Sequence, residues 1–537
     1  MAMPRFNFSD VLHWLMIMYE HVTLLDVVLS LLGLFVFSCA VEKLRSKGRP
    51  MVWPVFGILP TVPLRQDAVY DWSTESLIRS GGTFPYRGVW FGGSYGIVTC
   101  ESANIEYMLK TRFENYPKGE YYRERFRDLL GDGIFNVDSH QWKQQRRLAT
   151  SEMHSARFVA HSYRTVQELV HHKLLSLLGR LARSGDRIDL QDVLLRFTFD
   201  NICTAAFGVD PGCLAPDLPE VPFATAFEVA TELTLSRFLT PPFVWKPMRY
   251  FRVGFERRLA EAIKVVHEFA DKTVLDRSDE RSKFGSLGGR SDLLSRLMDR
   301  PAGQDNFSNI FLRDFCVSFI LAGRDTSSVA LAWFFWLVHE HPTVESRILH
   351  ELHEILSARE ECGPLDGVIF TPQELDKMVY LQAALSESLR LYPAVPMEIK
   401  EALEDDVLPD GTVLKKGARV LYCIFSMARM VSLWGEDCSE FRPERWLRGG
   451  EGGRELLRES PFKYAVFNAG PRLCIGKKFA YMQMKMVSAS VLLRYSVKVA
   501  KGCRAIPKIT TTLYMKYGLP VTIHPRFKPP EKTNVPM

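Results

Sequence analysis

One segment near the C-terminus sets a single cysteine between two glycines, with an arginine two positions before it: Phe467-Asn-Ala-Gly-Pro-Arg-Leu-Cys-Ile-Gly476. A cysteine thiolate donates enough electron density to haem iron to favour cleavage of the O–O bond. Gly470 and Gly476 suit a tight turn whose backbone N–H groups can hydrogen-bond the sulfur, and Arg472 is placed to meet a haem propionate. The complete spacing favours Cys474 as the axial ligand of haem iron over the alternative, a buried structural cysteine beside a turn.

A second motif, Ala322-Gly-Arg-Asp-Thr-Ser327, lies inside an apolar stretch, 315–338, that predicts a buried helix. Gly323 lowers helix propensity, and Asp325 beside Thr326 puts polar groups where only specific partners could satisfy them. An acid next to a hydroxyl is what proton delivery to an oxygen requires. The motif therefore indicates function, the alternative being a helix with an incidental polar step.

Two weaker spacings accompany these motifs. Glu387-Ser-Leu-Arg390 sets a carboxylate and a guanidinium on one helix face, and Phe441-Arg-Pro-Glu-Arg-Trp446 lies downstream of it. Trp142-Lys-Gln-Gln-Arg146 brings two hydrogen-bond donors without acceptors onto one face, which suits a carboxylate. Each alone is also typical of a solvated surface helix.

Together the motifs resemble those of the cytochrome P450 haem-thiolate monooxygenases, from about Trp53 to the C-terminus. The resemblance implies a mainly α (α+β) fold, a helical haem domain with small β-sheets, that binds haem b and uses O2 as co-substrate. It implies that the haem is held by seven residues, with Cys474 as the iron ligand: Trp142, Arg146, Phe467, Gly470, Arg472, Cys474 and Gly476.

The resemblance also implies roles for the other motifs. Thr326 would donate a hydrogen bond at the oxygen site, where the helix is kinked, and Asp325 would relay protons. Glu387, Arg390 and Arg445 would form a structural cluster that locks the fold around the haem loop and takes no catalytic part.

Within the family, the chain is most similar to plant fatty-acid ω-hydroxylases, through phrases such as Leu129-Leu-Gly-Asp-Gly-Ile-Phe135 and Phe207-Gly-Val-Asp-Pro211. This implies oxygen insertion at the terminal carbon of long- or very-long-chain fatty acids. Because the methyl C–H bond is stronger than those of the methylenes, a narrow slot must select it by geometry. The residues expected to line that slot flank the motifs, with core packing as the alternative for each: Phe319, Leu321, Val395, Met397, Leu513 and Tyr514.

Other functions stay open from the sequence. A cytochrome P450 that oxidises another lipophile, such as an alkane or a hormone conjugate, would carry the same motifs. A haem protein without turnover is disfavoured by the Asp325–Thr326 pair, because a sensor needs no proton relay. The same pair disfavours isomerisation of peroxides.

The N-terminus predicts a membrane anchor. Residues 22–41 supply about the 20 apolar positions that a spanning helix needs, and the basic Lys43, Arg45, Lys47 and Arg49 follow. We therefore expect a short lumenal segment (1–21), a single-pass anchor (22–41), a basic and proline-rich hinge (42–60) and a cytosolic haem domain (61–537) at the endoplasmic reticulum membrane. A cleaved signal peptide is the less favoured alternative, since the apolar stretch is long and no small-residue cleavage site is evident.

Composition agrees with one large domain behind the anchor. The 537 residues are 47% hydrophobic and 24% charged, with mainly helical periodicity. Strand-like runs are predicted at 86–99, 412–422 and 510–523, and surface loops at 276–290 and 448–460.

Charge and cysteine usage narrow the possible partners. The ten cysteines include no CxxC pair, which suits a reducing compartment, and the net charge of +6 gives no reason to expect nucleic acid. No GxGxxG or GxxxxGK[ST] fingerprint is present, so the chain is not expected to bind NADPH itself. By resemblance, electrons come from NADPH-cytochrome P450 reductase, for which Lys477 and Lys478 could form part of a basic docking patch or simply be solvated.

Overall fold

The computed structural model describes residues 23–46, 49–65, 67–89, 94–299, 307–360, 367–449 and 455–526. The predicted lumenal segment 1–21 and most of the C-terminal tail lie outside these residues.

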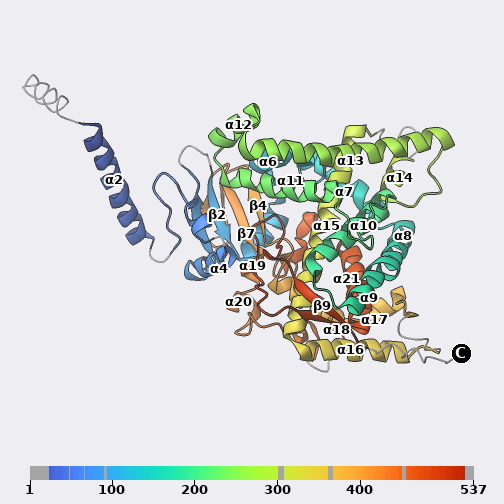
Figure 1. The fold of residues 1–537 in the computed structure, drawn as a ribbon. Coiled ribbons are helices and arrows are strands. Elements are labelled where there is room, and N and C mark those ends of the chain that lie inside the picture. The colour runs from blue at the N-terminus through green and yellow to red at the C-terminus, as the bar shows by residue number, and fades with distance from the viewer. Residues whose placement is uncertain are drawn as a thin grey trace, which may run out of the picture.

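The N-terminal helix α2 (Leu24–Arg45) stands apart from the body of the molecule (Figure 1). None of its side chains is buried, although it is apolar and long enough to span a bilayer. A capping box begins it, because Asp26 Oδ2 accepts from the Thr23 backbone N–H at 3.0 Å and the Thr23 hydroxyl accepts from the Asp26 N–H at 3.3 Å. Asp26 thus serves the helix start, and the helix runs four residues beyond the predicted 22–41 segment.

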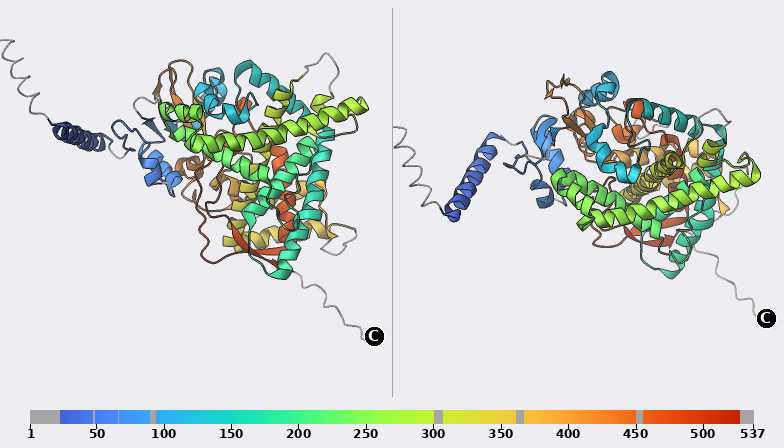
Figure 2. Two further views of the ribbon diagram at one scale, coloured as in Figure 1. Left: turned by 45° about the horizontal axis from the view of Figure 1, so that its top comes forward. Right: turned by 90° about the horizontal axis from the view of Figure 1, so that it is seen from above.

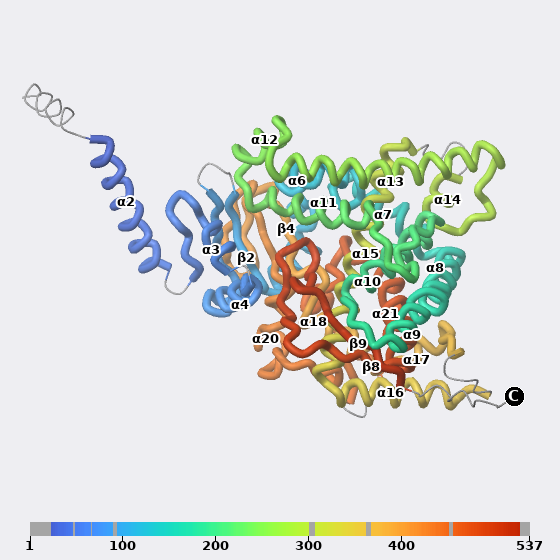
Figure 3. The backbone as a smooth tube through the Cα atoms, in the orientation of Figure 1, coloured from blue at the N-terminus to red at the C-terminus, as the bar shows by residue number. Residues whose placement is uncertain are grey.

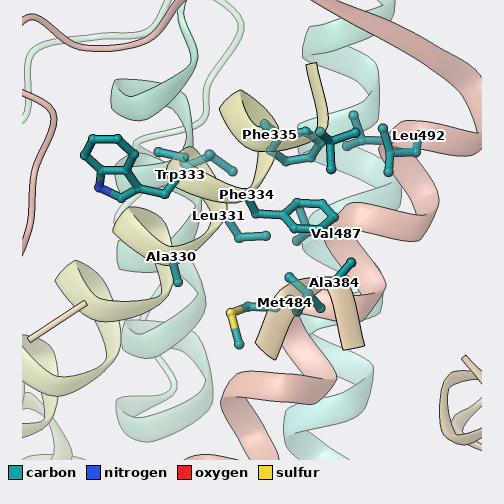
Figure 4. Close-up of a cluster of buried hydrophobic side chains, with 14 of the residues drawn as sticks. Ala330, Leu331, Trp333, Phe334, Phe335, Ala384, Met484, Val487 and Leu492 are labelled. Atoms are coloured by element: carbon teal, nitrogen blue, oxygen red, sulfur yellow. The ribbon is translucent and has the colours of Figure 1, made fainter. Parts of the chain in front are cut away.

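Four helices pack side by side in the centre of the body: α10 (Leu190–Phe207), α15 (Asn309–Glu340), α18 (Val379–Leu391) and α21 (Lys477–Arg494). Figure 4 shows Phe334 and Phe335 of α15 in one cluster with Ala384 of α18 and with Met484, Val487 and Leu492 of α21. The apolar run that predicts a helix over 315–338 forms the buried part of α15.

At Gly323 helix α15 lies close against α10. A Cβ at this glycine would come within 2.6 Å of the Ile202 side chain. α15 is helical from Asn309 to Glu340, and Gly323 permits close packing of two helices at this point.

Helices α6 (Gly119–Leu130), α11 (Pro222–Leu239), α12 (Pro242–Phe251) and α13 (Gly254–Phe284) lie over one end of α15 (Figure 2). The prediction of a surface loop at 276–290 is wrong for its first nine residues, because they form the last turns of α13. Asp276, Asp279 and Lys283 of these turns are exposed, whereas Arg277 is buried and its guanidinium bonds Glu280 at 2.8 Å along the helix.

Three small sheets accompany the helices. β1 (Thr83–Arg87), β2 (Tyr95–Thr99), β7 (Arg419–Cys423) and β4 (Met397–Glu401) form one sheet in that order. β2 and β7 are parallel, and the other two pairs are antiparallel. β3 (Ile188–Asp189), β9 (Pro520–Pro525) and β8 (Tyr495–Val499) form a second sheet, and β5 (Asp406–Val407) pairs with β6 (Val413–Leu414).

The C-terminal segment between β8 and β9 turns back toward the middle of the chain, as the red part of the tube in Figure 3 shows. The Leu513 N–H donates to the Ala394 carbonyl at 2.9 Å. Most of the strand predicted at 510–523 is therefore irregular backbone, and only its end belongs to β9.

The remaining α-helices are α3 (Thr61–Leu64), α4 (Val69–Arg79), α5 (Ser102–Glu106), α7 (Ser139–Met153), α8 (Ala156–Glu168), α9 (Leu175–Ser184), α14 (Leu293–Met298), α16 (Pro342–Ser357), α17 (Pro372–Lys377), α19 (Ile424–Met427) and α20 (Val431–Trp434). Short π- and 3-10 helices are η1 (Tyr107–Thr111), η2 (Phe113–Asn115), η3 (Leu169–Leu174), η5 (Pro443–Trp446), η7 (Ala465–Phe467) and η8 (Gly470–Arg472).

Candidate active site

Cys474 lies in the loop between η8 and α21, on the wall of a cavity of about 320 Å³ that we call the thiol cavity. Of the nine cysteines in the part of the chain that the structure describes, it alone is exposed. Surrounding protein raises the pKa of its thiol, while the Gly476 backbone N–H and the Arg146 and Lys477 cations act in the opposite direction. These three groups favour the thiolate form of Cys474.

Gly470 fixes how the cysteine loop meets the rest of the fold. Its φ of +59° is unfavourable for other residues, and a Cβ there would lie 2.0 Å from the Leu109 carbonyl oxygen of η1. Gly476 has an ordinary φ of −81°. It acts on the Cys474 thiol through its backbone N–H and not through an unusual backbone conformation. The two glycines that bracket the cysteine therefore do different work.

Hydrogen-bond donors gather at one end of the thiol cavity. The Arg472 guanidinium bonds Asp138 at 2.6 Å and lies 4.4 Å from the Trp142 ring centroid, while its Nε is buried without a partner. Arg146, also on α7, donates to the Leu473 carbonyl of the cysteine loop. The helix that carries Trp142 and Arg146 is thus tied directly to the loop that carries Cys474.

Three residues of this end escaped the sequence analysis. Lys118 bonds Glu398 at 3.0 Å, and both line the thiol cavity. Lys400 follows Glu398 on the same face of β4, and its Nζ is buried without a partner. Burial lowers the pKa of Lys400 to about 7, because the attraction of Glu398 is offset by Arg472 and Lys118. The sequence feature that could have revealed Glu398 and Lys400 is an acid and a lysine at alternate positions of a partly buried strand.

Thr326 and Asp325 face different surroundings although they are neighbours on α15. Thr326 lines the thiol cavity, and its hydroxyl donates to the Ala322 carbonyl at 2.6 Å. Asp325 is fully buried and outside that lining. Its Oδ1 accepts from the Arg324 guanidinium at 2.7 Å, while Oδ2 has no hydrogen-bond partner among the residues that the structure describes. The structure therefore brings only one member of the predicted pair to the cavity.

A second cavity of about 340 Å³, the outer cavity, adjoins the thiol cavity. The two share six lining residues: Lys118, Tyr122, Phe126, Val395, Glu398 and Thr511. From there the outer cavity extends past Met397 to α3, α4 and the turn before α12. The shared wall places the outer cavity, which reaches the hinge and α3, directly beside the cavity that contains Cys474.

The predicted slot residues divide between these cavities and the core. Phe319 and Leu321 line the thiol cavity, Met397 the outer cavity and Val395 both. Leu513 and Tyr514 line neither, and the side chains of both are buried in the core. The Leu513 carbonyl accepts from the Trp333 indole at 2.7 Å, so this turn of chain is held inward. Thr511 and Thr512 take the places at the thiol cavity that the sequence assigned to Leu513 and Tyr514.

Glu387, Arg390 and Arg445 meet below the cysteine loop. Arg390 grips both carboxylate oxygens of Glu387 at 2.8 Å, and Arg445 Nε reaches Glu387 Oε1 at 3.3 Å. The Trp446 indole N–H adds a bond to Glu387 Oε2 at 2.9 Å. The cluster joins α18 to η5, and none of its four residues lines either cavity.

The family model of cytochrome P450 matches residues 48–520. The chain belongs to the cytochrome P450 family. The match covers most of the chain and includes the cysteine loop, both cavities and the Glu387 cluster.

Among relatives, cytochrome P450 86B1 of Arabidopsis thaliana is 51% identical over 92% of this chain and 89% of its own length. Cytochrome P450 CYP94D108 of Paris polyphylla is 42% identical over 90% of this chain and 92% of its own. Noroxomaritidine synthase 1 of Narcissus pseudonarcissus is 36% identical over 93% and 96%, respectively.

Membership of the family implies a haem, and the residues of the thiol cavity fit one. Cys474 offers a thiol at its wall, and Thr326 and Phe319 belong to the α15 side of the lining. At the donor end, Arg472 Nε is buried without an acceptor among the described residues, and a propionate carboxylate would supply one. In this cytochrome P450, Trp142, Arg146 and Arg472, which line the thiol cavity, would therefore hold the propionates, and Cys474 the iron.

Proposed function

We propose that this cytochrome P450 hydroxylates the terminal carbon of long- or very-long-chain fatty acids. The observation that carries the proposal is the pair of adjoining cavities, which lead from the anchor side of the molecule to Cys474 between apolar walls. An extended acyl chain suits such a route, because each buried CH₂ contributes about 0.8 kcal/mol. The similarity to cytochrome P450 86B1 and to CYP94D108 over nearly the whole chain is in keeping with it.

The bound haem supplies the oxidant that inserts one atom of O2 into a C–H bond. The other oxygen atom is reduced to water, which consumes two electrons and two protons. The chain's own residues then have separate tasks. Thr326 carries a hydroxyl that can hold a proton at the cavity wall, and Phe319 and Leu321 exclude water from it. Val395, where the two cavities meet, limits which carbon of the substrate can reach the site.

The electrons come from NADPH-cytochrome P450 reductase at the endoplasmic reticulum membrane, with α2 as the anchor and the haem domain in the cytosol. Lys477 and Lys478 are exposed at the start of α21, directly after the cysteine loop. Two cations beside the loop suit an acidic partner surface.

The test is a product analysis of the full-length protein with the reductase in microsomes. Saturated fatty acids of graded length are supplied, and an alkane and a hormone conjugate serve as rival substrates. We expect hydroxylation at the terminal carbon, with affinity rising with length until the cavities are full. In-chain products at every length, or turnover of a rival substrate alone, would refute the proposal.

A matched pair of variants tests whether the junction of the cavities sets the position of attack. Val395→Ala removes volume at the junction, and Val344→Ala removes the same volume from the core on α16. The first should increase in-chain products relative to terminal ones, and the second should leave that ratio unchanged.

Oxidation of another lipophile is the second candidate. Noroxomaritidine synthase 1, named for a different product, is 36% identical over nearly its whole length. The same substrate panel separates the two candidates.

A further inference from the structure

Arg125 is a cation in an apolar part of the outer cavity. It lies on α6, its residue is 2% exposed, and it lines the outer cavity but not the thiol cavity. It therefore belongs to the part of the route that is more distant from Cys474.

The hydrogen bonds of Arg125 all go to neutral acceptors. Its Nε donates to the Arg237 carbonyl at 3.1 Å and its Nη1 to the Tyr121 carbonyl at 2.8 Å. Its Nη2 has no acceptor among the residues that the structure describes. The guanidinium also stacks on the Tyr121 ring at 3.5 Å. This stacking orients the charged group without neutralising it.

The acidic residues nearby are taken by other cations. Glu256 and Asp128 bind Arg237 at 2.6 and 2.8 Å, respectively. Glu124 approaches Arg125 only to 4.0 Å and pairs with Lys246 at 2.5 Å. Arg125 thus has no carboxylate at hydrogen-bond distance in the described part of the chain.

The other cations that line the two cavities each have a protein partner. Lys118 has Glu398 at 3.0 Å, Arg472 has Asp138 at 2.6 Å, and Arg146 donates to the Leu473 carbonyl. A buried charge without a counter-ion is destabilising, and a planar guanidinium binds a carboxylate through two parallel hydrogen bonds. The unmatched charge of Arg125 is therefore complementary to an anionic head group on the molecule that fills the outer cavity.

We propose that Arg125 binds the substrate carboxylate in the outer cavity. The inference rests on the proposed fatty-acid function and adds how the acid is held. With the head group fixed at Arg125, the length of the acyl chain determines which carbon reaches the thiol cavity. A neutral lipid of the same length lacks this restraint and should bind more weakly.

The experiment measures binding of a long-chain acid, its methyl ester and the corresponding primary alcohol to the full-length haem protein in nanodiscs, from the change in the haem spectrum. Hydrogen bonds to a charged group are worth about 1.5–3 kcal/mol, so the wild type should prefer the acid by about 10- to 100-fold. Arg125→Gln should remove this preference while leaving affinity for the ester unchanged, and Arg125→Lys should restore part of it.

The control is Arg249→Gln, which breaks the exposed ion pair of Arg249 with Asp128 in the same network without touching either cavity lining. It should keep the wild-type preference for the acid. Equal loss of acid and ester binding in Arg125→Gln would make Arg125 purely structural and overturn the inference. If Arg125→Gln fails to bind haem, the test is made on the wild type alone. Equal affinity of the wild type for the acid and the ester would also overturn the inference.

The outcomes also separate this inference from the function on which it rests. If the wild type hydroxylates fatty acids at the terminal carbon and Arg125→Gln still prefers the acid to the ester, only the role of Arg125 is overturned. A wild type that oxidises no fatty acid would overturn both.

Discussion

At the scale of single residues, the oxygen-site pair is divided by its surroundings. Thr326 faces the thiol cavity, whereas Asp325 is buried behind it in an ion pair with Arg324. Burial alone would lower the pKa of Arg324, and the charge of Asp325 more than compensates, so the pKa is raised. Loss of the Thr326 side chain and loss of the Asp325 side chain should therefore have different effects.

Thr326→Ala should leave stability and haem content nearly unchanged while NADPH is consumed with release of peroxide in place of product. Asp325→Asn should also lower the unfolding free energy, because breaking a buried ion pair costs about 3–5 kcal/mol. The measurements are product formed per NADPH and the melting temperature. Thr326→Ser, which keeps the hydroxyl, is the control and should remain coupled. Unchanged coupling in Thr326→Ala would remove the assigned role.

At the scale of elements, the Glu387 cluster joins α18 to the segment before the cysteine loop. Arg390 also donates to the Cys438 and Glu440 carbonyls at 2.7 and 3.1 Å. Its planar guanidinium therefore holds a loop segment against α18. A lysine keeps the charge but cannot reproduce this fork.

Arg390→Lys should therefore lower the amount of protein that folds with haem and destabilise the remainder by about 3 kcal/mol or more. Haem content per chain and the denaturation midpoint report both effects. Arg442→Lys, which alters an exposed ion pair with Asp437 beside the cluster, is the control. A variant with normal haem content and stability would show that charge alone suffices.

A second element-scale prediction concerns η3, the π-helix that packs on α21. Burial lowers the pKa of His171 from 6.5 to about 4, with Arg494 and His172 adding to the effect, and its Nε2 is buried without a partner. Between these pH values the unfolded chain binds a proton that the folded chain excludes. The contribution of His171 to stability is thus complete above pH 6.5 and decreases as the pH falls toward 4.

His171→Gln should show a smaller fall in melting temperature between pH 7 and pH 5 than the wild type. The exposed His172→Gln serves as the matched control and should follow the wild type more closely. An identical pH dependence in all three proteins would contradict the role of His171.

The sequence predicted features that are local along the chain and missed those that depend on packing. The cysteine loop and the Glu387–Arg390 spacing are contiguous, so their residue types were sufficient to propose a haem site. Arg125 and Lys400 became visible only in the folded chain, where, among the described residues, Arg125 has no carboxylate at hydrogen-bond distance and Lys400 Nζ has no partner. β8 was missed because it continues the apolar run of α21, and Leu513 was misplaced because its turn bonds Ala394 and Trp333.

At the scale of the whole molecule, exposed apolar residues lie on two elements that adjoin the outer cavity. Phe243, Tyr250 and Phe251 of α12 are 54%, 82% and 70% exposed, and Leu64 of α3 is 73% exposed. Ile58, Leu59 and Val62 of the adjoining hinge and α3 line the outer cavity, and α2 leaves the body on this side (Figure 1). The outer cavity therefore lies toward the side of the molecule that carries the anchor.

Deletion of residues 1–46 should remove the spanning helix and leave a protein that binds haem but still associates with liposomes through these side chains. Replacing Phe243, Tyr250 and Phe251 with serine in the truncated protein should release it, since burial of each aromatic ring contributes about 1.5–3 kcal/mol. Flotation with liposomes measures the bound fraction. Phe284→Ser is the matched control, because this exposed ring lies at the other end of α13 from α12 (Figure 1). A truncated protein without haem would show that the anchor belongs to the fold, and equal binding by the triple variant would place the membrane contact elsewhere.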